Sequence, residues 1–368
     1  MVPHELAAWL RLLGTPGVGI DSARKLLAAF GPPEAVFQQE RPALHVVVGP
    51  RLAQALLTPP DDLAATIINT TTAWLAGGTN RHVLSLADPR FPGELLQMAD
   101  PPVLLYVLGQ IDILQHPQRL AIVGSRNPTP QGEQNARQFA QALGEAGVCV
   151  VSGLALGVDG AAHEGALAGG APTLAVVGTG LDRVYPKRHL ALAHRIAQQG
   201  ALISEYPLGT PPLPGNFPRR NRLIAGLSQG TLVVEAALQS GSLITARLAA
   251  EQGREVFAIP GSIHAPQSRG CHALIRQGAK LVESAQDILE DLRITSPTAQ
   301  VTSESIVDPL VDPEGLLRAM GFDPVSLDAL QARTGLDTAT LQARLLELEL
   351  QDAIARLPGG LLQRLGQG

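Results

Sequence analysis

Three arginines within four residues are the feature of this sequence that most clearly indicates chemistry. They are Arg219, Arg220 and Arg222, and they lie in a segment that runs from residue 216 to residue 246. Each guanidinium offers a planar fork of N–H donors that fits the oxygens of a phosphate. We interpret the arginine segment as a cationic loop and predict an anion site there. The alternative is a surface arginine cluster beside an ordinary core strand.

The residues after the arginines predict the elements that would position an anion. The apolar run 231–234 is too short for a helix and rich in β-branched side chains, so it predicts a strand buried on both faces. Small and hydroxylated residues follow at 240–245, where a helix would begin. Because the N–H groups at a helix start are unpaired, such a start attracts anions.

Three more apolar runs predict strands, and each of them ends at a glycine. The runs are 119–123, 148–152 and 173–177, and the glycines are Gly124, Gly153 and Gly178. Helices are predicted after the first two strands, over 130–146 and 159–167. Glycine lets backbone N–H groups approach a ligand, and ligands of doubly wound sheets bind outside the carboxyl ends of the strands. No complete dinucleotide or Walker motif is present, so those cofactor sites are not indicated.

Composition favours an α/β protein. The 368 residues leave room for two or three domains, and 38 glycines with only 3% aromatic residues argue against a β-sandwich. Two cysteines, Cys149 and Cys271, are too few for a disulfide framework or a metal cluster. There is no signal peptide and no apolar run of 18 residues, which predicts a soluble, cytoplasmic protein.

Charge is distributed unevenly along the chain. The net charge is −5, yet residues 119–280 hold 15 Lys and Arg against 9 Asp and Glu, a local balance of +6. Residues 1–118 hold 7 against 10, and residues 281–368 hold 6 against 14. Because local potential governs binding to a polyanion, the basic centre is compatible with a nucleic acid ligand.

The two ends of the chain predict smaller helical units. Residues 1–80 show helical spacing around a turn at 14–19, which resembles a helix-hairpin-helix turn, and 48–51 is a weaker second copy. Such a turn can contact a DNA phosphate, although a tight turn between helices needs no ligand. Residues 294–312 are rich in Ser, Thr, Pro and acidic residues and predict a linker.

Residues 313–368 predict a winged helix, with three helical stretches and a hairpin around Pro358. The third stretch, 338–350, carries one arginine against two glutamates, so it lacks the cationic face that groove binding needs. A role in protein contact or packing is favoured. The same acidity disfavours a sequence-specific regulator that reads DNA through this helix.

Six motifs of the central segment resemble the DNA-processing protein A (DprA/Smf) family. They are AIVGSR at 121–126, SGLALGVDGAAHEGAL at 152–167, GTGLDRVYPK at 178–187, EYPLGTPPLPGNFPRRNRLIAGLS at 205–228, EAALQSGSLITA at 235–246 and IPG at 259–261. The resemblance implies an extended Rossmann-like, doubly wound, mostly parallel sheet over 81–293. It also implies a helical helix-hairpin-helix or SAM-like domain over 1–80 and a winged-helix domain over 313–368.

The resemblance further implies what the protein does. It implies single-stranded DNA binding without sequence preference, no enzymatic activity, and loading of the RecA recombinase onto DNA in natural transformation and recombination. It also implies a homodimer formed through the Rossmann-like domain. The DNA contacts carried over by motif are Gly124, Ser125, Arg126, Ser152, Gly153, Lys187, Arg219, Asn221, Arg222, Ser242 and Thr245.

Four polar residues near these motifs leave alternatives open. His189 and His272 stand where the family pattern has Asn, and an imidazole there can hydrogen-bond, stack on a base or simply pack. His163 follows Asp159 by four residues, a spacing open to a metal or acid–base role. Because no second His or Cys lies at ligand spacing, a structural pair that orients the glycine-rich loop is favoured.

An enzyme is the competing class of function. QGTLVVE at 229–235 is reminiscent of the GTxxE motif of nucleotide-hydrolysing phosphoribohydrolases, with Glu235 as the candidate base. Those proteins need PGG before GT, and this chain has Leu-Ser-Gln at 227–229. Binding is therefore the favoured function. Few aromatic side chains lie in the central domain, so base stacking is expected to contribute little.

Overall fold

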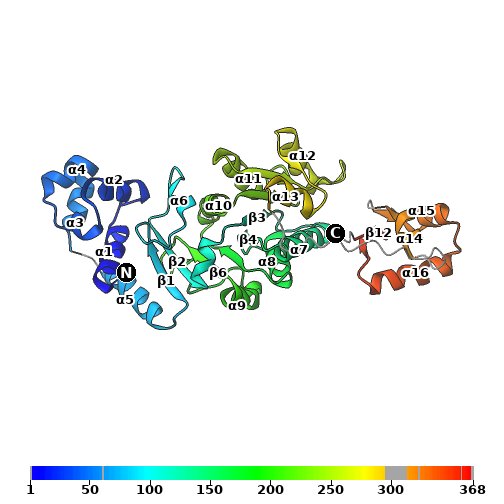
Figure 1. Cartoon of the computed structure of the whole chain (residues 1–368), viewed down its shortest axis with the longest axis horizontal. Coiled ribbons are helices and arrows are strands. Elements are labelled where there is room, and N and C mark those ends of the chain that lie inside the picture. Colours follow the sequence, from blue (N-terminus) through cyan, green and yellow to red (C-terminus); the bar gives the residue numbers. More distant parts are fainter. Residues whose placement is uncertain (1, 60–61, 295–312, 322–323, 358, 366–368) are drawn as a thin grey trace.

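The computed structural model describes residues 2–59, 62–294, 313–321, 324–357 and 359–365. They form a unit of five helices, a nine-stranded sheet with helices on both faces, and a small C-terminal unit (Figure 1). Apart from Ile294, the predicted linker lies outside the described residues.

The N-terminal unit is entirely helical. Its helices are α1 (Pro3–Gly14), α2 (Ile20–Phe30), α3 (Pro33–Phe37), α4 (Arg41–Leu57) and α5 (Asp62–Ala76). The first predicted turn joins α1 to α2, as the sequence indicates. The second lies within α4, where Gly49 adopts a φ of 79° and interrupts the helix. Helices α1, α2 and α4 pack against one another in a single core, in which Leu12, Leu26 and Leu44 are buried.

Nine strands form the central sheet in the order β1-β2-β6-β5-β4-β3-β7-β8-β9. β1 and β2 run antiparallel to their neighbours, and the other seven strands are parallel. Their bounds are β1 (Arg81–Ser85), β2 (Leu104–Gly109), β3 (Arg119–Val123), β4 (Cys149–Ser152), β5 (Thr173–Val176), β6 (Ala201–Ser204), β7 (Gly230–Val233), β8 (Glu255–Ala258) and β9 (Lys280–Leu281). The predicted class, a mostly parallel doubly wound sheet, is confirmed.

Helices cover both faces of the sheet, which is why its central strands are continuous apolar runs. On one face α7 (Pro130–Glu145), α8 (Val158–Ala168) and α13 (Ala285–Asp291) share a core with β3 and β4. The opposite face is covered by α6 (Gly93–Leu96), α10 (Asn216–Gly226), α11 (Gly241–Glu251) and α12 (Arg269–Arg276). Helix α9 (Leu190–Gln199) packs near β2, β5 and β6.

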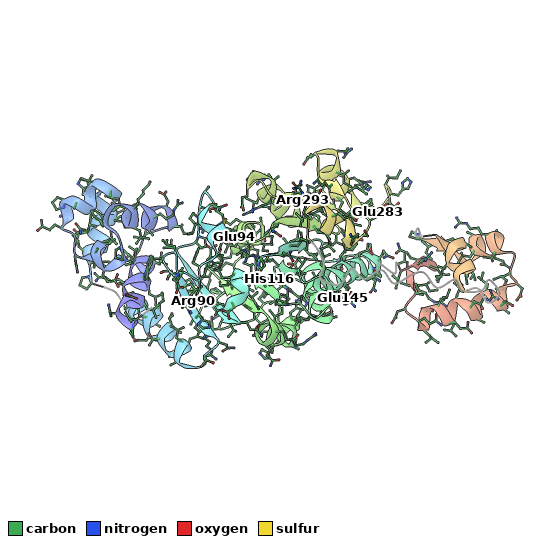
Figure 2. The ribbon with its side chains drawn as sticks, viewed as in Figure 1. Arg90, Glu94, His116, Glu145, Glu283 and Arg293 are labelled. Carbon is green, nitrogen blue, oxygen red and sulfur yellow. The ribbon has the colours of Figure 1, made fainter. Side chains whose placement is uncertain are left out.

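The order of the strands reverses at β3. The chain adds β4, β5 and β6 on one side of β3 and then crosses to add β7, β8 and β9 on the other. In open α/β sheets the carboxyl ends of the strands at such a reversal border the ligand crevice. The opposite end of β3 is fixed by Arg119, which donates to Leu227 O at 2.7 Å and pairs with Glu94 at 2.5 Å. Glu94 lies on α6 (Figure 2).

The C-terminal unit is a winged helix, as predicted. It contains α14 (Pro313–Met320), α15 (Leu327–Thr334), α16 (Thr338–Leu350) and a sheet of β10 (Val325–Ser326), β12 (Leu361–Arg364) and β11 (Ile354–Leu357). Helix α16 buries Leu341, Leu345 and Leu348 in the core of this unit. Within the described part of the chain, no helix is both long enough and apolar enough to cross a membrane.

Candidate nucleic-acid interface

A cavity of about 520 Å³ opens at the carboxyl ends of β3 and β7. Its walls come from the loop after β3, the beginning of α8, the first turns of α10 and the beginning of α11. Six of the predicted DNA contacts line it. They are Gly124, Ser125, Arg126, Asn221, Ser242 and Thr245. The sequence therefore located the cavity through glycines and hydroxyls that follow separate strands.

Two glycines bring together the loops beside this cavity, and Gly124 lines it. A Cβ on Gly124 would lie 2.7 Å from Val158 Cγ2, closer than real side chains approach. Gly157 has a φ of 76°, and a Cβ there would lie 2.5 Å from the carbonyl oxygen of Ser125. Only glycine allows the two loops to approach this closely. The N–H of Ser125 is in turn held by the carbonyl oxygen of Glu235 at 2.7 Å.

The start of α11 forms the opposite wall. Ser240 caps the helix, and its hydroxyl lies 2.7 Å from that of Ser242. Asn221 Nδ2 donates to the carbonyl oxygen of Gly241 at 3.4 Å, which links α10 to this helix start. The predicted helix start is confirmed, and its hydroxyls lie where an anion can be bound.

The three arginines do not form the single anion site predicted from their spacing. They lie on helix α10, not on a loop, so successive side chains leave the helix in different directions. Arg219 is exposed, whereas Arg220 and Arg222 are 3% and 5% exposed. The prediction of a cationic loop is wrong. The inward face of this helix carries arginines in place of apolar residues, so the sequence does not show the apolar periodicity that would have predicted a helix.

Each buried arginine is held by the protein itself. Arg220 lines the cavity, but its Nη1 donates to Gly153 O at 2.6 Å and to Val176 O. Arg222 pairs with Asp100 at 3.0 Å and with Glu205. Arg222 is not among the residues that line the cavity. Both side chains are therefore placed to join the segments around the sheet edge.

Three other predicted contacts lie outside the cavity lining. Ser152 is buried, and its hydroxyl donates to Ile122 O at 2.6 Å, which ties β4 to β3. Gly153 lies under the guanidinium of Arg220, where a Cβ would overlap it. Lys187 is exposed in a short 3-10 helix (Lys187–His189). For these three residues, as for the six that line the cavity and for Arg219 and Arg222, DNA contact stays a prediction.

Sequence reasoning missed an aromatic pair at the mouth of the cavity. The rings of Tyr185 and Phe217 lie 5.6 Å apart, and Tyr185 is 48% exposed. The guanidinium of Arg126 lies 5.5 Å from the centre of the Phe217 ring. Exposed Lys187 and Arg219 each lie two residues from one of these rings. The mouth therefore combines the Phe217 ring with the exposed guanidinium of Arg126.

Asp159 places a carboxylate in the cavity wall. It is 8% exposed, and its Oδ2 accepts from the N–H of Ala155 at 3.3 Å. Burial raises the pKa of Asp159, and the positive charges of Arg220 and Arg126 oppose that rise. Asp159 thus balances the buried charge of Arg220 and holds the glycine-rich loop through Ala155, without the His163 partner that the sequence predicts.

The predicted pairing of Asp159 with His163 is wrong. His163 is completely buried, and its Nδ1 lies 2.7 Å from the hydroxyl of Thr173. That hydroxyl donates its proton to Val150 O, so it accepts from His163, and Nδ1 carries the hydrogen. His163 therefore joins α8 to β4 and β5. Within the described ranges no cluster of His, Cys, Asp or Glu could hold a metal ion.

His163 should make the stability of the fold depend on pH. Burial lowers its pKa to about 3, below the unfolded value of about 6.5. The unfolded chain therefore binds a proton that the folded chain does not, so stability is fully present above pH 6.5 and falls as the pH drops toward 3. We expect this residue to remove about 2 kcal/mol between pH 7 and pH 5.

Urea unfolding of the wild type and of His163→Gln across this pH range measures the effect. The variant should show a flatter dependence of unfolding free energy on pH. His264→Gln is the control, because His264 is exposed, and it should retain the wild-type slope. Equal slopes for His163→Gln and the wild type would contradict the assignment.

The two histidines that replace asparagine both hold loops. His189 Nδ1 lies 3.0 Å from Leu154 O, and the ring packs against Gly160 of α8. His272 Nε2 lies 3.0 Å from Gly261 O. Each ring therefore lies within hydrogen-bond distance of the backbone of a neighbouring loop, so each histidine packs against a loop and hydrogen-bonds to it.

Glu235 faces away from the cavity. Its carboxylate accepts from the backbone N–H of Thr129 at 2.9 Å and from the Thr129 hydroxyl at 2.6 Å. Burial raises the pKa of Glu235. Because the carboxylate fills the space beside Gly132 at the start of α7 and does not line the cavity, its visible role is structural.

The fold and the cavity together define a Rossmann-like ligand-binding protein with a winged helix attached. A family model described as DNA recombination-mediator protein A matches residues 82–293, and a DprA winged helix domain model matches residues 304–360. The chain belongs to the DNA recombination-mediator protein A family. The resemblance drawn from the motifs is confirmed.

Several relatives are similar over much of their length. Protein Smf of Escherichia coli K12 is 44% identical over 300 residues, 80% of each chain. DNA processing protein DprA of Streptococcus pneumoniae is 49% identical over 207 residues, 56% of this chain and 73% of the relative.

Two solved structures of such proteins are also similar. The X-ray structure of the S. pneumoniae protein is 38% identical, with a TM-score of 0.67 over 76% of this chain and 95% of that one. The structure of DNA processing protein A from Helicobacter pylori is 34% identical, with a TM-score of 0.53 over 58% and 96%. The latter is described as having a unique single-stranded DNA binding mode.

Proposed function

We propose that this protein binds single-stranded DNA without sequence preference at the cavity beside β3 and β7. The observation that carries the proposal is the mouth of the cavity, where Arg126 lies over the ring of Phe217 and that ring lies against Tyr185. Cations and ring faces in one place suit a strand whose phosphates and bases are both accessible. The single-stranded DNA binding described for the H. pylori relative supports this choice of ligand.

One phosphate would occupy the cavity itself. Its oxygens would accept from N–H groups at the start of α11 and from the hydroxyls of Ser242 and Thr245. Neighbouring phosphates would lie against the exposed cations Arg126, Lys187 and Arg219. Since these are contacts to the phosphates of the DNA, they fix the position of the DNA strand and carry no sequence information.

The aromatic pair would hold a base by stacking. Stacking of a base on an aromatic ring contributes about 1–3 kcal/mol and tolerates every base, because each base has a flat face. With Tyr185 and Phe217 side by side, base stacking would contribute more than the small number of aromatic residues in the central domain predicts. The absence of sequence preference remains part of the proposal.

Catalysis is not part of the proposed function. The candidate base, Glu235, is bonded to Thr129 and does not line the cavity. A nucleotide-processing hydrolase needs an acid or base beside the reacting atoms. The carboxylate in the cavity wall, that of Asp159, is engaged by the N–H of Ala155 and the charge of Arg220. Turnover of a mononucleotide by the purified chain would overturn this part of the proposal.

We also propose that the protein loads RecA onto DNA in natural transformation and recombination, in the cytoplasm, as a homodimer through the Rossmann-like domain. Membership of a family described as recombination mediators supports the RecA role.

ATP hydrolysis by RecA on DNA covered with single-strand binding protein should begin sooner when the chain is added. An unchanged delay would contradict loading, and a monomer in sedimentation would contradict the homodimer.

Fluorescence anisotropy tests the DNA proposal. Labelled single-stranded and duplex oligonucleotides of several sequences are titrated with the protein at several salt concentrations. We expect tighter binding of the single strand, similar affinities for different sequences, and weaker binding at higher salt. Equal affinity for the duplex, or a single strand displaced by excess mononucleotide, would favour another function.

A further inference from the structure

The loop that follows α6, residues 97–100, is fastened to helix α10 at two points. Met98 packs so closely against the end of α10 that a Cβ added to Gly226 would lie 2.7 Å from its Sδ atom. Two residues further along, the carboxylate of Asp100 forms an ion pair with Arg222 Nε at 3.0 Å. Gly226 and Arg222 are four residues apart, so both points lie on the same side of the helix. The loop therefore holds α10 over one helical turn.

Helix α10 also carries one wall of the cavity. Phe217, Arg220 and Asn221 are among the residues that line the cavity, whereas residues 97–100 lie outside its lining. Phe217 lies about 7.5 Å from Arg222 along the helix axis. Because a helix moves as a stiff unit, a change in how Arg222 is held displaces the ring of Phe217 and the amide of Asn221.

Arg222 is also held by a buried carboxylate. Its guanidinium pairs with Glu205, which directly follows β6, and both side chains are 6% exposed. The side chain of Asp100, by contrast, is 59% exposed. Removal of the Asp100 carboxylate leaves Arg222 with its buried partner, so the fold should persist while α10 loses its link to the loop.

The N-terminal helical unit reaches the same loop. Nη1 of Arg24 on α2 donates to the carbonyl oxygen of Ala99 at 2.6 Å. Ala99 lies between Met98 and Asp100, so consecutive residues of the loop contact α10, α2 and α10 again. Figure 1 shows α6 between α2 and α10. One short loop therefore joins the N-terminal unit to the helix that carries the cavity wall.

We propose that Asp100 and Arg222 are positioning residues for DNA, through which the N-terminal helical unit sets the affinity of the cavity. This inference rests on the proposed binding of single-stranded DNA at that cavity. Arg24 fixes the loop, the loop fixes α10, and α10 fixes the ring and the amide that face the strand. Packed side chains and stiff helices carry such coupling, so the N-terminal unit changes the affinity without contacting DNA.

Asp100→Ala separates positioning from charge. Loss of a carboxylate removes a negative charge, and charge alone would strengthen binding to a polyanion. Positioning predicts the opposite, a weakening of single-stranded DNA binding by about threefold to tenfold in anisotropy titrations of the full-length chain. Asp100→Glu retains the ion pair and should recover most of the affinity. Asp112→Ala is the matched control, because Asp112 is exposed on the central domain, and it should stay within about twofold of the wild type.

Arg24→Ala tests the link to the N-terminal unit. We expect binding about twofold to fivefold weaker, with an unchanged slope of log affinity against log salt, because no phosphate contact is lost. Lys25→Ala is the control, because Lys25 is exposed on the same helix, and it should bind like the wild type. A slope that falls by about 0.7 in Arg24→Ala would show direct contact with a phosphate and would overturn this link.

Fluorine NMR measures the position of α10 without DNA. The chain has three tyrosines, so 3-fluorotyrosine gives three signals. Tyr185 and Tyr206 both contact the first turn of α10, whereas Tyr106 is buried on β2. Asp100→Ala should shift the signals of Tyr185 and Tyr206 and leave that of Tyr106 in place. Arg24→Ala should shift the same two signals by less.

Two results would overturn the proposal. One is unchanged or tighter DNA binding by Asp100→Ala, and the other is a fluorine spectrum of that variant identical to the wild type. Failure of the proposed function has a different outcome, in which the wild type binds no single strand at all. The fluorine signals would then still decide whether the loop holds α10.

Discussion

Replacing Arg126 and Arg219 together by alanine should weaken single-stranded DNA binding about 100-fold. Both side chains are exposed, Arg126 in the lining of the cavity and Arg219 on α10, whose first turns line it, and we propose that each contacts a phosphate. A charge-assisted hydrogen bond of this kind contributes about 1.5 kcal/mol or more, and 1.4 kcal/mol is a factor of ten. The slope of log affinity against log salt should fall by about 0.7 for each phosphate contact removed.

Anisotropy titrations of Arg126→Ala/Arg219→Ala over a series of salt concentrations measure both quantities. Arg247→Ala is the control, because Arg247 is exposed on α11 and does not line this cavity. It should stay within about twofold of the wild type. An unchanged slope and affinity in the double variant would refute the phosphate contacts. An unchanged unfolding midpoint would show that the loss of binding is local.

Replacing Arg220 by methionine should destabilise the fold by about 3–5 kcal/mol at pH 7, as removal of one partner of a buried charge pair does. The change leaves the carboxylate of Asp159 buried without its cation and removes the donor to Gly153 O and Val176 O. Guanidinium unfolding measures the loss. Arg219→Met is the matched control, because Arg219 is exposed, and it should change stability by less than about 0.5 kcal/mol.

The pH dependence of this loss has a definite sign. Burial already raises the folded pKa of Asp159, and loss of Arg220 would raise it further. A carboxyl with a raised folded pKa destabilises the fold above that pKa, and the penalty disappears as the pH falls through it. Arg220→Met should therefore recover stability at low pH, and Asp159→Asn should recover part of it at pH 7. A loss that is small and independent of pH would contradict the pairing.

Buried parallel strands were the part of the fold most open to prediction. β3, β4, β5 and β7 are covered on both faces, so each is a continuous apolar run, and glycine follows β3 and β4 directly and β5 after one residue. β1 lies at the antiparallel edge and includes Arg81 and His82, so it lacks such a run. β9 has only two residues, both exposed, and carries no pattern at all.

Helix α10 shows why the arginines were misread. Two positions on its inward side hold Arg220 and Arg222, where a helix normally places apolar residues. Their partners, Gly153, Asp100 and Glu205, lie far away in the sequence or carry no pairing signal. A buried arginine is recognisable only through such tertiary contacts.

The site was predictable only where it follows strand ends. Gly124, Ser125 and Ser242 could be placed because the carboxyl ends of parallel strands share one edge of the sheet. Tyr185 and Phe217 could not, because one lies in the loop after β5 and the other on α10. Only the packing of those two segments brings the rings together.

Photochemical crosslinking tests the central claim most directly. A single strand that contains 4-thiothymine is bound to the full-length protein and irradiated, and the attached peptides are identified by mass spectrometry. Attachment should concentrate at Tyr185, Phe217 and their neighbours beside the cavity, and Arg126→Ala/Arg219→Ala should reduce it. Attachment confined to α16 or to the turn at 14–19 would contradict the account and place the DNA elsewhere on the protein.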